Sequence, residues 1–247
     1  MISRRYVLLG ALAAVATASF GCSFGCGDSD VVVGHKVVAP PAGSTGLPAQ
    51  SAQTIAKDDA RPRVVVLGDS LTAGLGLSPE EAYPTLLQQK IDAAGLGMRV
   101  VNAGVSGDTS AGGLSRLDWS LEGDVRVLVV ALGGNDALRG LPVEELRNNL
   151  STIIERATAK KVRVVLAGME APPNFGQSYT DAFHRVYPDL ATQYNLPLVP
   201  FLLQGVAGIE RLNQRDGIHP TAEGARIVAD SVWTVLRTML NPTPTRR

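Results

Sequence analysis

Five short runs of valine and leucine are spread along the chain, and longer mixed stretches separate them. The runs lie at residues 63–67, 99–102, 125–132, 162–168 and 196–200. Apolar runs of this length are typical of strands buried on both faces of a parallel sheet. The stretches at 80–94, 142–159, 179–194 and 221–240 have the spacing or the first residues of helices. This alternation predicts a doubly wound α/β domain of about five parallel strands.

The first 26 residues are expected to be an export signal rather than part of this domain. Arg4 and Arg5 precede an apolar stretch at 6–20, which is short for a membrane span. The arginine pair resembles a twin-arginine signal, with Sec export and an uncleaved anchor as the alternatives. Residues 27–61, rich in Ala, Pro, Gly and Ser, are typical of a flexible tether. We therefore assign the folded domain to residues 62–241 and a disordered tail to 242–247.

The two cysteines of the chain, Cys22 and Cys26, follow the apolar stretch. Residues 19–22 resemble a bacterial lipobox, although Ser19 stands where leucine is usual, and this makes Cys22 a candidate for lipidation. Cys26 is a second candidate, and a disulfide between the two cysteines is the alternative. We expect an exported protein, either periplasmic or held at a membrane as a lipoprotein.

Composition excludes several classes of function. The chain has 23 basic and 23 acidic residues and only 5% aromatic residues, so it lacks the basic surface of a nucleic-acid binder. The domain contains no cysteine, which rules out a thiol nucleophile there. Walker, His-Glu-x-x-His and Gly-x-Ser-x-Gly motifs are missing from the sequence. We expect no metal and no cofactor, and we expect a monomer.

Four polar segments stand at or just past the predicted strands or before the last helix, at 68–70, 102–108, 133–136 and 216–219. The carboxyl ends of parallel strands share one edge of a sheet, and ligands bind there in open α/β folds. The four segments should therefore meet at that edge.

Together these segments offer the groups that acyl transfer needs. Ser70 is the candidate nucleophile, at the start of a helix where its own N–H is free. His219 is the candidate base, since the other two histidines fall in the tether and on a predicted helix. Asp216 can hold its imidazole. The Ser70 N–H, the Gly104 N–H and the Asn135 amide are candidate donors to an oxyanion.

At these residues the chain resembles the SGNH hydrolases, also called GDSL esterases or lipases. The letters S, G, N and H of the first name match Ser70, Gly104, Asn135 and His219. The matching segments include GDSLTAGLGLSPEEAYPTLL, VVNAGVSGDTSAGGLSRL, VVALGGNDALRGLP and DGIHP. Within the family they are most similar to the bacterial multifunctional thioesterase/lysophospholipase/arylesterase enzymes. The resemblance implies a flavodoxin-like three-layer α/β/α fold and metal-free hydrolysis by Ser70, His219 and Asp216, with Ser70, Gly104 and Asn135 as the oxyanion hole.

The resemblance also implies a substrate-binding surface. Residues 137–142 would form a substrate loop in which Leu138 and Leu141 contact an acyl chain. Residues 172–175, including Pro173, would form another wall. Asp69 is expected to fix the turn beside Ser70 and to border the substrate.

The function predicted from these residues is a serine esterase acting on small acyl, aryl or thioesters, or on lysophospholipids. A carbohydrate O-deacetylase or acyltransferase acting on surface glycans would use the same groups and is the first alternative. A catalytically silent binding module is the second, and the intact set of Ser70, Asn135, Asp216 and His219 argues against it. The expected partner is a small acyl-ester or lipid substrate, together with a membrane if Cys22 carries a lipid.

Overall fold

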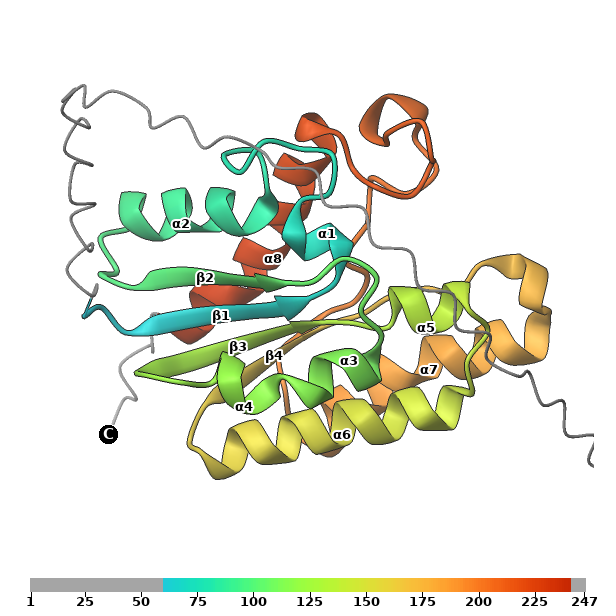
Figure 1. Ribbon diagram of the computed structural model, residues 1–247, viewed down its shortest axis with the longest axis horizontal. Helices are drawn as coiled ribbons and strands as arrows, with labels where there is room; N and C mark the ends of the chain where they lie inside the picture. Colours follow the sequence, from blue (N-terminus) through green and yellow to red (C-terminus); the bar gives the residue numbers. More distant parts are fainter. Residues whose placement is uncertain (1–59, 241–247) are drawn as a thin grey trace, which may run out of the picture. The chain divides into compact units, whose positions relative to one another are not determined.

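Five parallel strands form one sheet, in the order β2-β1-β3-β4-β5 (Figure 1). The computed structural model describes residues 60–240, so the predicted signal, nearly all of the tether and the tail lie outside it. The central strands have no exposed face, because residues 64–67 and 127–130 are at most 1% accessible. The strands are β1 (Arg63–Gly68), β2 (Arg99–Gly104), β3 (Val125–Ala131), β4 (Arg163–Ala167) and β5 (Leu198–Val199).

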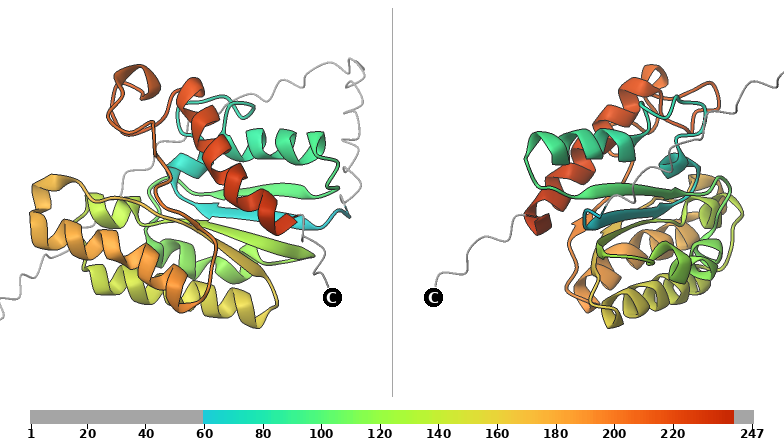
Figure 2. Two further views of the ribbon diagram at one scale, coloured as in Figure 1. Left: turned by 180° about the vertical axis from the view of Figure 1, so that it is seen from behind. Right: turned by 60° about the vertical axis from the view of Figure 1, so that its left-hand side comes forward.

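Helices cover both faces of the sheet and make three layers. Helices α2 and α8 lie on one face and α3, α6 and α7 on the other, as the right-hand view of Figure 2 shows. No helix of residues 60–240 has both the length and the apolar character to cross a membrane. The longer helices are α2 (Tyr83–Ala93), α6 (Val143–Ala159), α7 (Gln177–Gln193) and α8 (Ala222–Leu240). The shorter ones are α1 (Ser70–Ala73), α3 (Ser110–Ser115), α4 (Leu117–Ser120) and α5 (Gly134–Leu138), with the 3-10 helices η1 (Pro173–Phe175) and η2 (Glu210–Leu212).

This arrangement confirms the predicted α/β class, the parallel sheet and its five strands. The largest difference is in β5, which has two residues where the sequence predicted five. Strand β5 is at the edge of the sheet and pairs only with β4. Pro197 and Pro200 flank it, and a proline has no N–H to donate to a strand ladder. The apolar run therefore ends as a loop rather than as a full strand.

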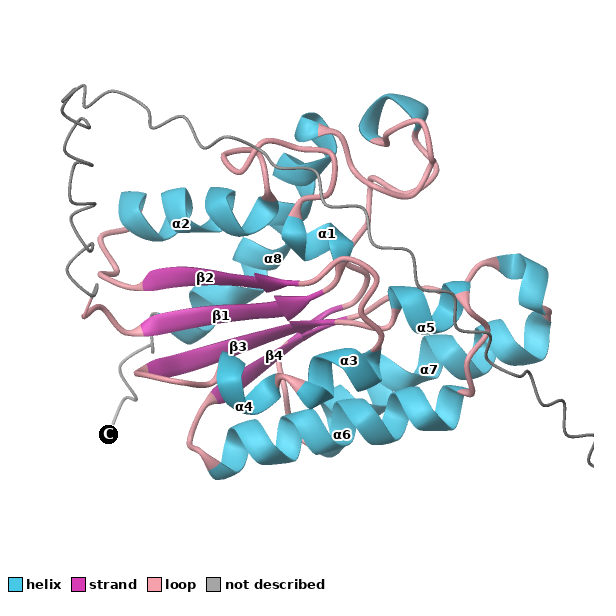
Figure 3. Ribbon diagram, viewed as in Figure 1, coloured by secondary structure: helices cyan, strands magenta, loops and turns pink. Residues whose placement is uncertain are grey.

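The ends of β1 and of its two neighbours, β2 and β3, lie level with one another, and this places the polar segments together. Gly68 at the end of β1 is in register with Gly104 of β2 and with Ala131 of β3. Figure 3 shows the arrowheads at a common edge, where α1, α3 and α5 begin. The chain leaves β1 toward one face and β2 toward the other, so a crevice opens at this edge.

Candidate active site

The turn after β1 presents Ser70 as the first residue of α1. A Cβ on Gly68 would lie 2.0 Å from the Thr72 hydroxyl, so the sharp turn requires glycine there. Asp69 caps the helix, since its Oδ1 accepts the Leu71 N–H at 3.0 Å. The Ser70 N–H has no acceptor within residues 60–240, and it points out of the first turn as a free donor.

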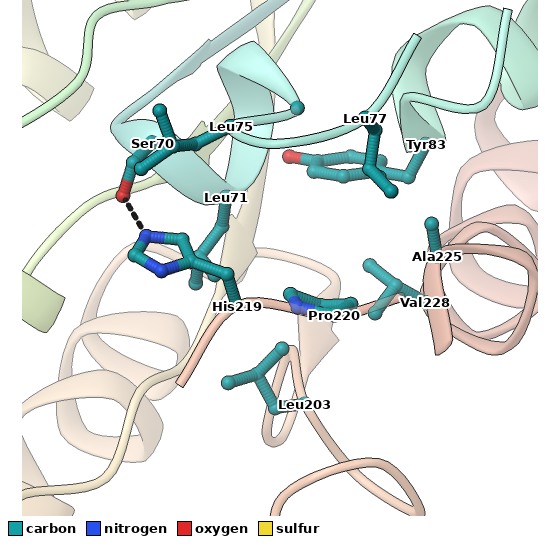
Figure 4. A pocket seen from close by; sticks show the side chains of 11 residues that line it. Ser70, Leu71, Leu75, Leu77, Tyr83, Leu203, His219, Pro220, Ala225 and Val228 are labelled. Atoms are coloured by element: carbon teal, nitrogen blue, oxygen red, sulfur yellow. Dashed lines mark hydrogen bonds between the residues drawn. The ribbon is translucent and has the colours of Figure 1, made fainter. Parts of the chain in front are cut away.

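Ser70, His219 and Asp216 form an unbroken series of hydrogen bonds. Ser70 Oγ lies 2.8 Å from His219 Nε2, the contact dashed in Figure 4. His219 Nδ1 lies 2.7 Å from Asp216 Oδ2. The other carboxylate oxygen of Asp216 accepts the backbone N–H groups of Ile218 and His219, at 2.9 and 3.0 Å. These N–H donors, first that of His219 and then that of Ile218, lower the pKa of Asp216 to about 2, and the imidazole adds to the effect.

Gln214 fixes the loop that carries His219 against the loop after α1. Its backbone N–H donates to the His219 carbonyl at 2.7 Å. Its side-chain amide donates to the carbonyls of Leu75 and Pro220, at 2.7 and 2.9 Å. The loops that carry the histidine and the serine are therefore joined through the Gln214 side chain as well as by the Ser70–His219 hydrogen bond.

Asn135, the second residue of α5, lies on the other side of Ser70. Its Nδ2 donates to the Asp108 carbonyl at 2.9 Å and approaches Asp69 Oδ2 at 3.3 Å. Asp69 is only 2% exposed, and burial raises its pKa to about 6 although the Leu71 N–H and the nearby His219 oppose the rise. The longer contact to Asp69 is the weaker of the two, which leaves that N–H able to turn toward a ligand.

Gly104 is a poor candidate for an oxyanion donor, contrary to the sequence prediction. It is the last residue of β2, and its N–H already donates to Asn102 Oδ1 at 2.9 Å. The nearby Gly107 is the better candidate, because its N–H has no acceptor in the part of the chain that the structure describes. The next residue, Asp108, accepts the Asn135 amide at its carbonyl, so Gly107 and Asn135 lie close together. Sequence reasoning missed Gly107 although it stands in the same segment.

An apolar cavity of about 420 Å³ opens beside Ser70, Asn135 and His219. Leu138 and Pro173 line it as predicted, and Asp69 borders it. Leu141 does not line it, which corrects the prediction; its carbonyl instead accepts the Tyr179 hydroxyl at 2.9 Å. The other lining residues are Leu71, Gly134, Met169, Glu170, Ala171, Pro172, Phe201, Leu203, Ala207, Gly217 and Ile218.

A second hollow, of about 10 Å³, is also lined by Ser70 and His219. Figure 4 shows Leu75, Leu77 and Tyr83 around it. The two hollows share Ser70, Leu71, Leu203 and His219 in their walls. The hydroxyl of Ser70 is thus reached from a large apolar cavity, and the small hollow has room for little more than one water molecule.

Known proteins resemble this chain over the residues that form the site. The sequence profile of the GDSL-like lipase/acylhydrolase family matches residues 66–227. The chain belongs to this family, the SGNH hydrolases. It is therefore a carboxylic ester hydrolase. The profile runs from within β1 to the first part of α8, so the match covers all four polar segments at the sheet edge.

The alignments with individual relatives cover most of each relative's length. The "Esterase TesA" of Pseudomonas aeruginosa is 43% identical over 178 residues, which is 72% of this chain and 89% of that protein. The "Thioesterase 1/protease 1/lysophospholipase L1" of Escherichia coli is 37% identical over 72% of this chain and 85% of its own. A crystal structure of TesA superposes with a TM-score of 0.69, covering 72% of this chain and 99% of that one. The esterase EstA from Pseudoalteromonas sp. also gives 0.69, at 33% identity and 72% and 98% coverage.

Two further side chains of this SGNH hydrolase were not anticipated from the sequence. Glu170 lines the cavity and accepts a hydrogen bond from His184 Nδ1 at 2.7 Å. The sequence placed His184 on a helix, where it does lie, but gave no sign of this partner. Arg116, which lies between α3 and α4, donates hydrogen bonds to carbonyls at the ends of β1 and β2. Neither contact leaves a motif, because each joins residues that are distant in the chain or on different elements.

Proposed function

We propose that the chain hydrolyses small acyl esters and thioesters with Ser70 as nucleophile, His219 as general base and Asp216 as the residue that orients His219. One observation supports this above all others. The hydrogen-bonded series from Ser70 through His219 to Asp216 ends at the wall of an apolar cavity. A serine hydroxyl is a weak nucleophile until a base accepts its proton, and this series provides the base and its orientation.

In the first step Ser70 Oγ attacks the ester carbonyl carbon while its proton passes to His219 Nε2. The imidazolium that forms is stabilised by Asp216, which is ionised because its pKa is about 2. His219 then gives the proton to the leaving oxygen or sulfur, and the acyl group remains on Ser70. Water, deprotonated by the same nitrogen, releases the acid and restores the serine.

The negative oxygen of each tetrahedral intermediate requires donors that are already in place. The free N–H of Ser70, the amide of Asn135 and the free N–H of Gly107 are the three proposed donors. Asn135→Ala should lower kcat by about 10²–10³, the usual cost of losing one such donor. Unchanged turnover in that variant would remove Asn135 from the role.

The cavity favours an acyl chain over a sugar. Most of its lining is apolar, including Leu138, Met169, Phe201 and Leu203, whereas a sugar ring needs several polar partners. The names of the relatives, which include esterase, thioesterase, lysophospholipase and arylesterase, fit esters with varied leaving groups. The glycan deacetylase or acyltransferase is therefore the weaker candidate.

The purified domain with p-nitrophenyl esters of increasing acyl length tests this proposal. We expect turnover that Ser70→Ala abolishes, and labelling of Ser70 by a fluorophosphonate. Because Ser70 is small and lies at the surface of the cavity, the alanine variant should keep the wild-type circular dichroism spectrum. Turnover by a folded Ser70→Ala variant, or a greater rate on acetylated sugars than on acyl esters, would contradict the proposal.

We also propose that the protein is exported through its N-terminal signal and anchored by a lipid on Cys22. Support comes only from the sequence of residues 1–26, which lie outside the described part. Mass spectrometry of the mature N-terminus tests it, since a diacylglyceryl cysteine, a disulfide with Cys26 and a simple cleaved end differ in mass.

A further inference from the structure

Glu170 places a carboxylate in the wall of the cavity, whose lining is mostly apolar. The residue follows β4, and the segment that carries it is hydrogen-bonded to the segment at 199–202. The Gly168 N–H donates to the Val199 carbonyl at 2.8 Å, and the Gly168 carbonyl accepts the Leu202 N–H at 2.8 Å. Met169, between this anchor and Glu170, is 93% buried, since only 7% of its surface is exposed. The backbone at Glu170 therefore belongs to the rigid end of the sheet.

His184 of α7 holds the side chain of Glu170 in place. Its Nδ1 lies 2.7 Å from Glu170 Oε1, so one oxygen of the carboxylate is already engaged. No hydrogen bond to Glu170 Oε2 occurs within residues 60–240. A carboxylate fixed by one oxygen loses less freedom when its other oxygen binds a ligand, which is the benefit of preorganisation.

Within residues 60–240, the remainder of the cavity lining offers no lysine or arginine to balance this charge. Its titratable lining residues are Asp69, Glu170 and His219, and no lysine or arginine is among the residues that line it. Asp69 is buried and accepts a hydrogen bond from Asn135. His219 is hydrogen-bonded to Ser70 and Asp216. An anionic group in the cavity would therefore meet a carboxylate and find no counterion. A cationic group would meet an acceptor oxygen.

We propose that Glu170, held by His184, forms a subsite for a cationic group on the acyl part of the substrate and selects against anionic acyl groups. This inference rests on the proposed function and specifies its substrate class. The attraction between two partly exposed charges is modest. The subsite therefore sets the preference between esters and does not take part in the chemical step. Glu170 acts as a specificity residue, and the Ser70 reaction does not depend on it.

Three p-nitrophenyl esters with one common linear acyl chain test the subsite. The chain ends in a tert-butyl group, in the isosteric trimethylammonium group, or in a carboxylate. Values of kcat/KM are measured at about pH 8, where ordinary imidazoles are neutral. Wild type should prefer trimethylammonium over tert-butyl, and tert-butyl over carboxylate.

Glu170→Gln keeps the shape of the side chain and an oxygen for His184 while it removes the charge. It should lower the trimethylammonium to tert-butyl ratio of kcat/KM by about threefold to fivefold, and it should change the tert-butyl value by less than about twofold. Glu170→Lys should reverse the order and favour the carboxylate ester. Glu210→Gln is the matched control, because Glu210 is an exposed carboxylate on η2 that does not line the cavity.

The two levels of the proposal fail in different ways. If Glu170→Gln and Glu170→Lys both turn over the tert-butyl ester normally and keep the wild-type ratios, the subsite is wrong and the esterase function stands. An equal change of ratio in Glu210→Gln also overturns the subsite, since the effect would then be one of overall charge. If wild type turns over none of the esters and Ser70 takes up no fluorophosphonate, the proposed function fails and the subsite with it.

Discussion

The Arg116 guanidinium donates a hydrogen bond to the Gly68 carbonyl, with 2.8 Å between Nη2 and the oxygen. The same group donates to the Ala103 carbonyl at 2.7 Å and to Asp108 Oδ2 at 2.6 Å. One planar side chain with several N–H donors thus joins the end of β1, the end of β2 and the segment that contacts Asn135. Because Gly68 is two residues before Ser70, this contact links the nucleophile turn to the proposed oxyanion donors.

Replacing Arg116 should weaken both the fold and the activity. The side chains of Arg116 and Asp108 are 16% and 18% exposed, so Arg116→Ala leaves a largely buried carboxylate and two carbonyls without this donor. We expect the free energy of unfolding to fall by about 2–4 kcal/mol in urea titrations, and kcat to fall as well. Arg116→Lys keeps the charge but lacks the planar fork, and it should recover only part of each loss.

Arg126 supplies the control for that variant. It pairs with Asp124 at 2.6 Å, but both side chains are about half exposed. Arg126→Ala should change the free energy of unfolding by less than about 1 kcal/mol, as is usual for surface pairs. Equal losses in the two variants would mean that Arg116 contributes only an ordinary surface charge.

Gly133 should tolerate no side chain, because the turn before Asn135 is tight. Its φ is +117°, and a Cβ there would lie 2.0 Å from the Tyr187 hydroxyl, which donates to the Leu132 carbonyl. Gly133→Ala should therefore destabilise the protein by about 3 kcal/mol or more and displace Asn135, with a loss of kcat. Thermal unfolding and the rate on p-nitrophenyl butyrate measure the two effects.

The backbone and the steric parts of that effect can be separated. Gly208 also has a positive φ, +75°, but a Cβ there meets nothing within 4 Å. Gly208→Ala should cost about 1–2 kcal/mol, the penalty of the left-handed conformation alone, and leave kcat unchanged. If Gly133→Ala is as mild as Gly208→Ala, the close contact with Tyr187 does not control the site.

Asp216→Asn should lower kcat by about 10⁴ while it leaves the loop folded. The amide oxygen of asparagine can still accept the N–H groups of Ile218 and His219 that now reach Oδ1. Its NH₂ group cannot accept the Nδ1–H of His219, so the imidazolium formed in the reaction loses its partner. Single-turnover rates with a p-nitrophenyl ester measure the loss. Wild-type kcat in this variant would show that Asp216 serves the loop and not the base.

Much of the fold followed from the pattern of the sequence. The Val-rich runs predicted β1 to β4 to within two residues at either end, because a strand buried on both faces needs apolar side chains throughout. The pattern failed at β5, where Pro197 and Pro200 limit pairing that an apolar run alone does not reveal.

The site was predictable where its residues follow strands. Ser70 and Asn135 meet because they follow β1 and β3, whose carboxyl ends share one edge, and the loop before α8 brings His219 to the same place. The donor glycine was not predictable, since the choice between Gly104 and Gly107 depends on the Asn102 side chain, which occupies the N–H of Gly104. The contacts of Glu170 and Arg116 also left no sign in the sequence, because each depends on how separate elements pack.

Asp69 should make stability depend on pH. Its pKa is about 6 in the folded protein against an ordinary 3.8, chiefly because of burial, so the folded state holds a proton that the unfolded chain releases. The stabilisation from this proton is fully present below pH 3.8 and is lost as the pH rises through 6. Over this range the free energy of unfolding of wild type should fall relative to Asp69→Asn, which cannot titrate, by about 3 kcal/mol.

Urea titrations of wild type and Asp69→Asn at several pH values between 3.5 and 7.5, roughly the span over which the proton is lost, measure that difference. Other carboxyl groups titrate in both proteins and cancel in the comparison. Asparagine at position 69 also changes the contact with Asn135. That change shifts the difference in unfolding free energy by a constant and does not alter how the difference depends on pH. The difference should decline as the pH rises and level off above about pH 7. A difference that stays constant, or that grows with pH, would mean that Asp69 is ionised in the folded protein throughout this range, and that its hydrogen bonds from Leu71 and Asn135 outweigh its burial.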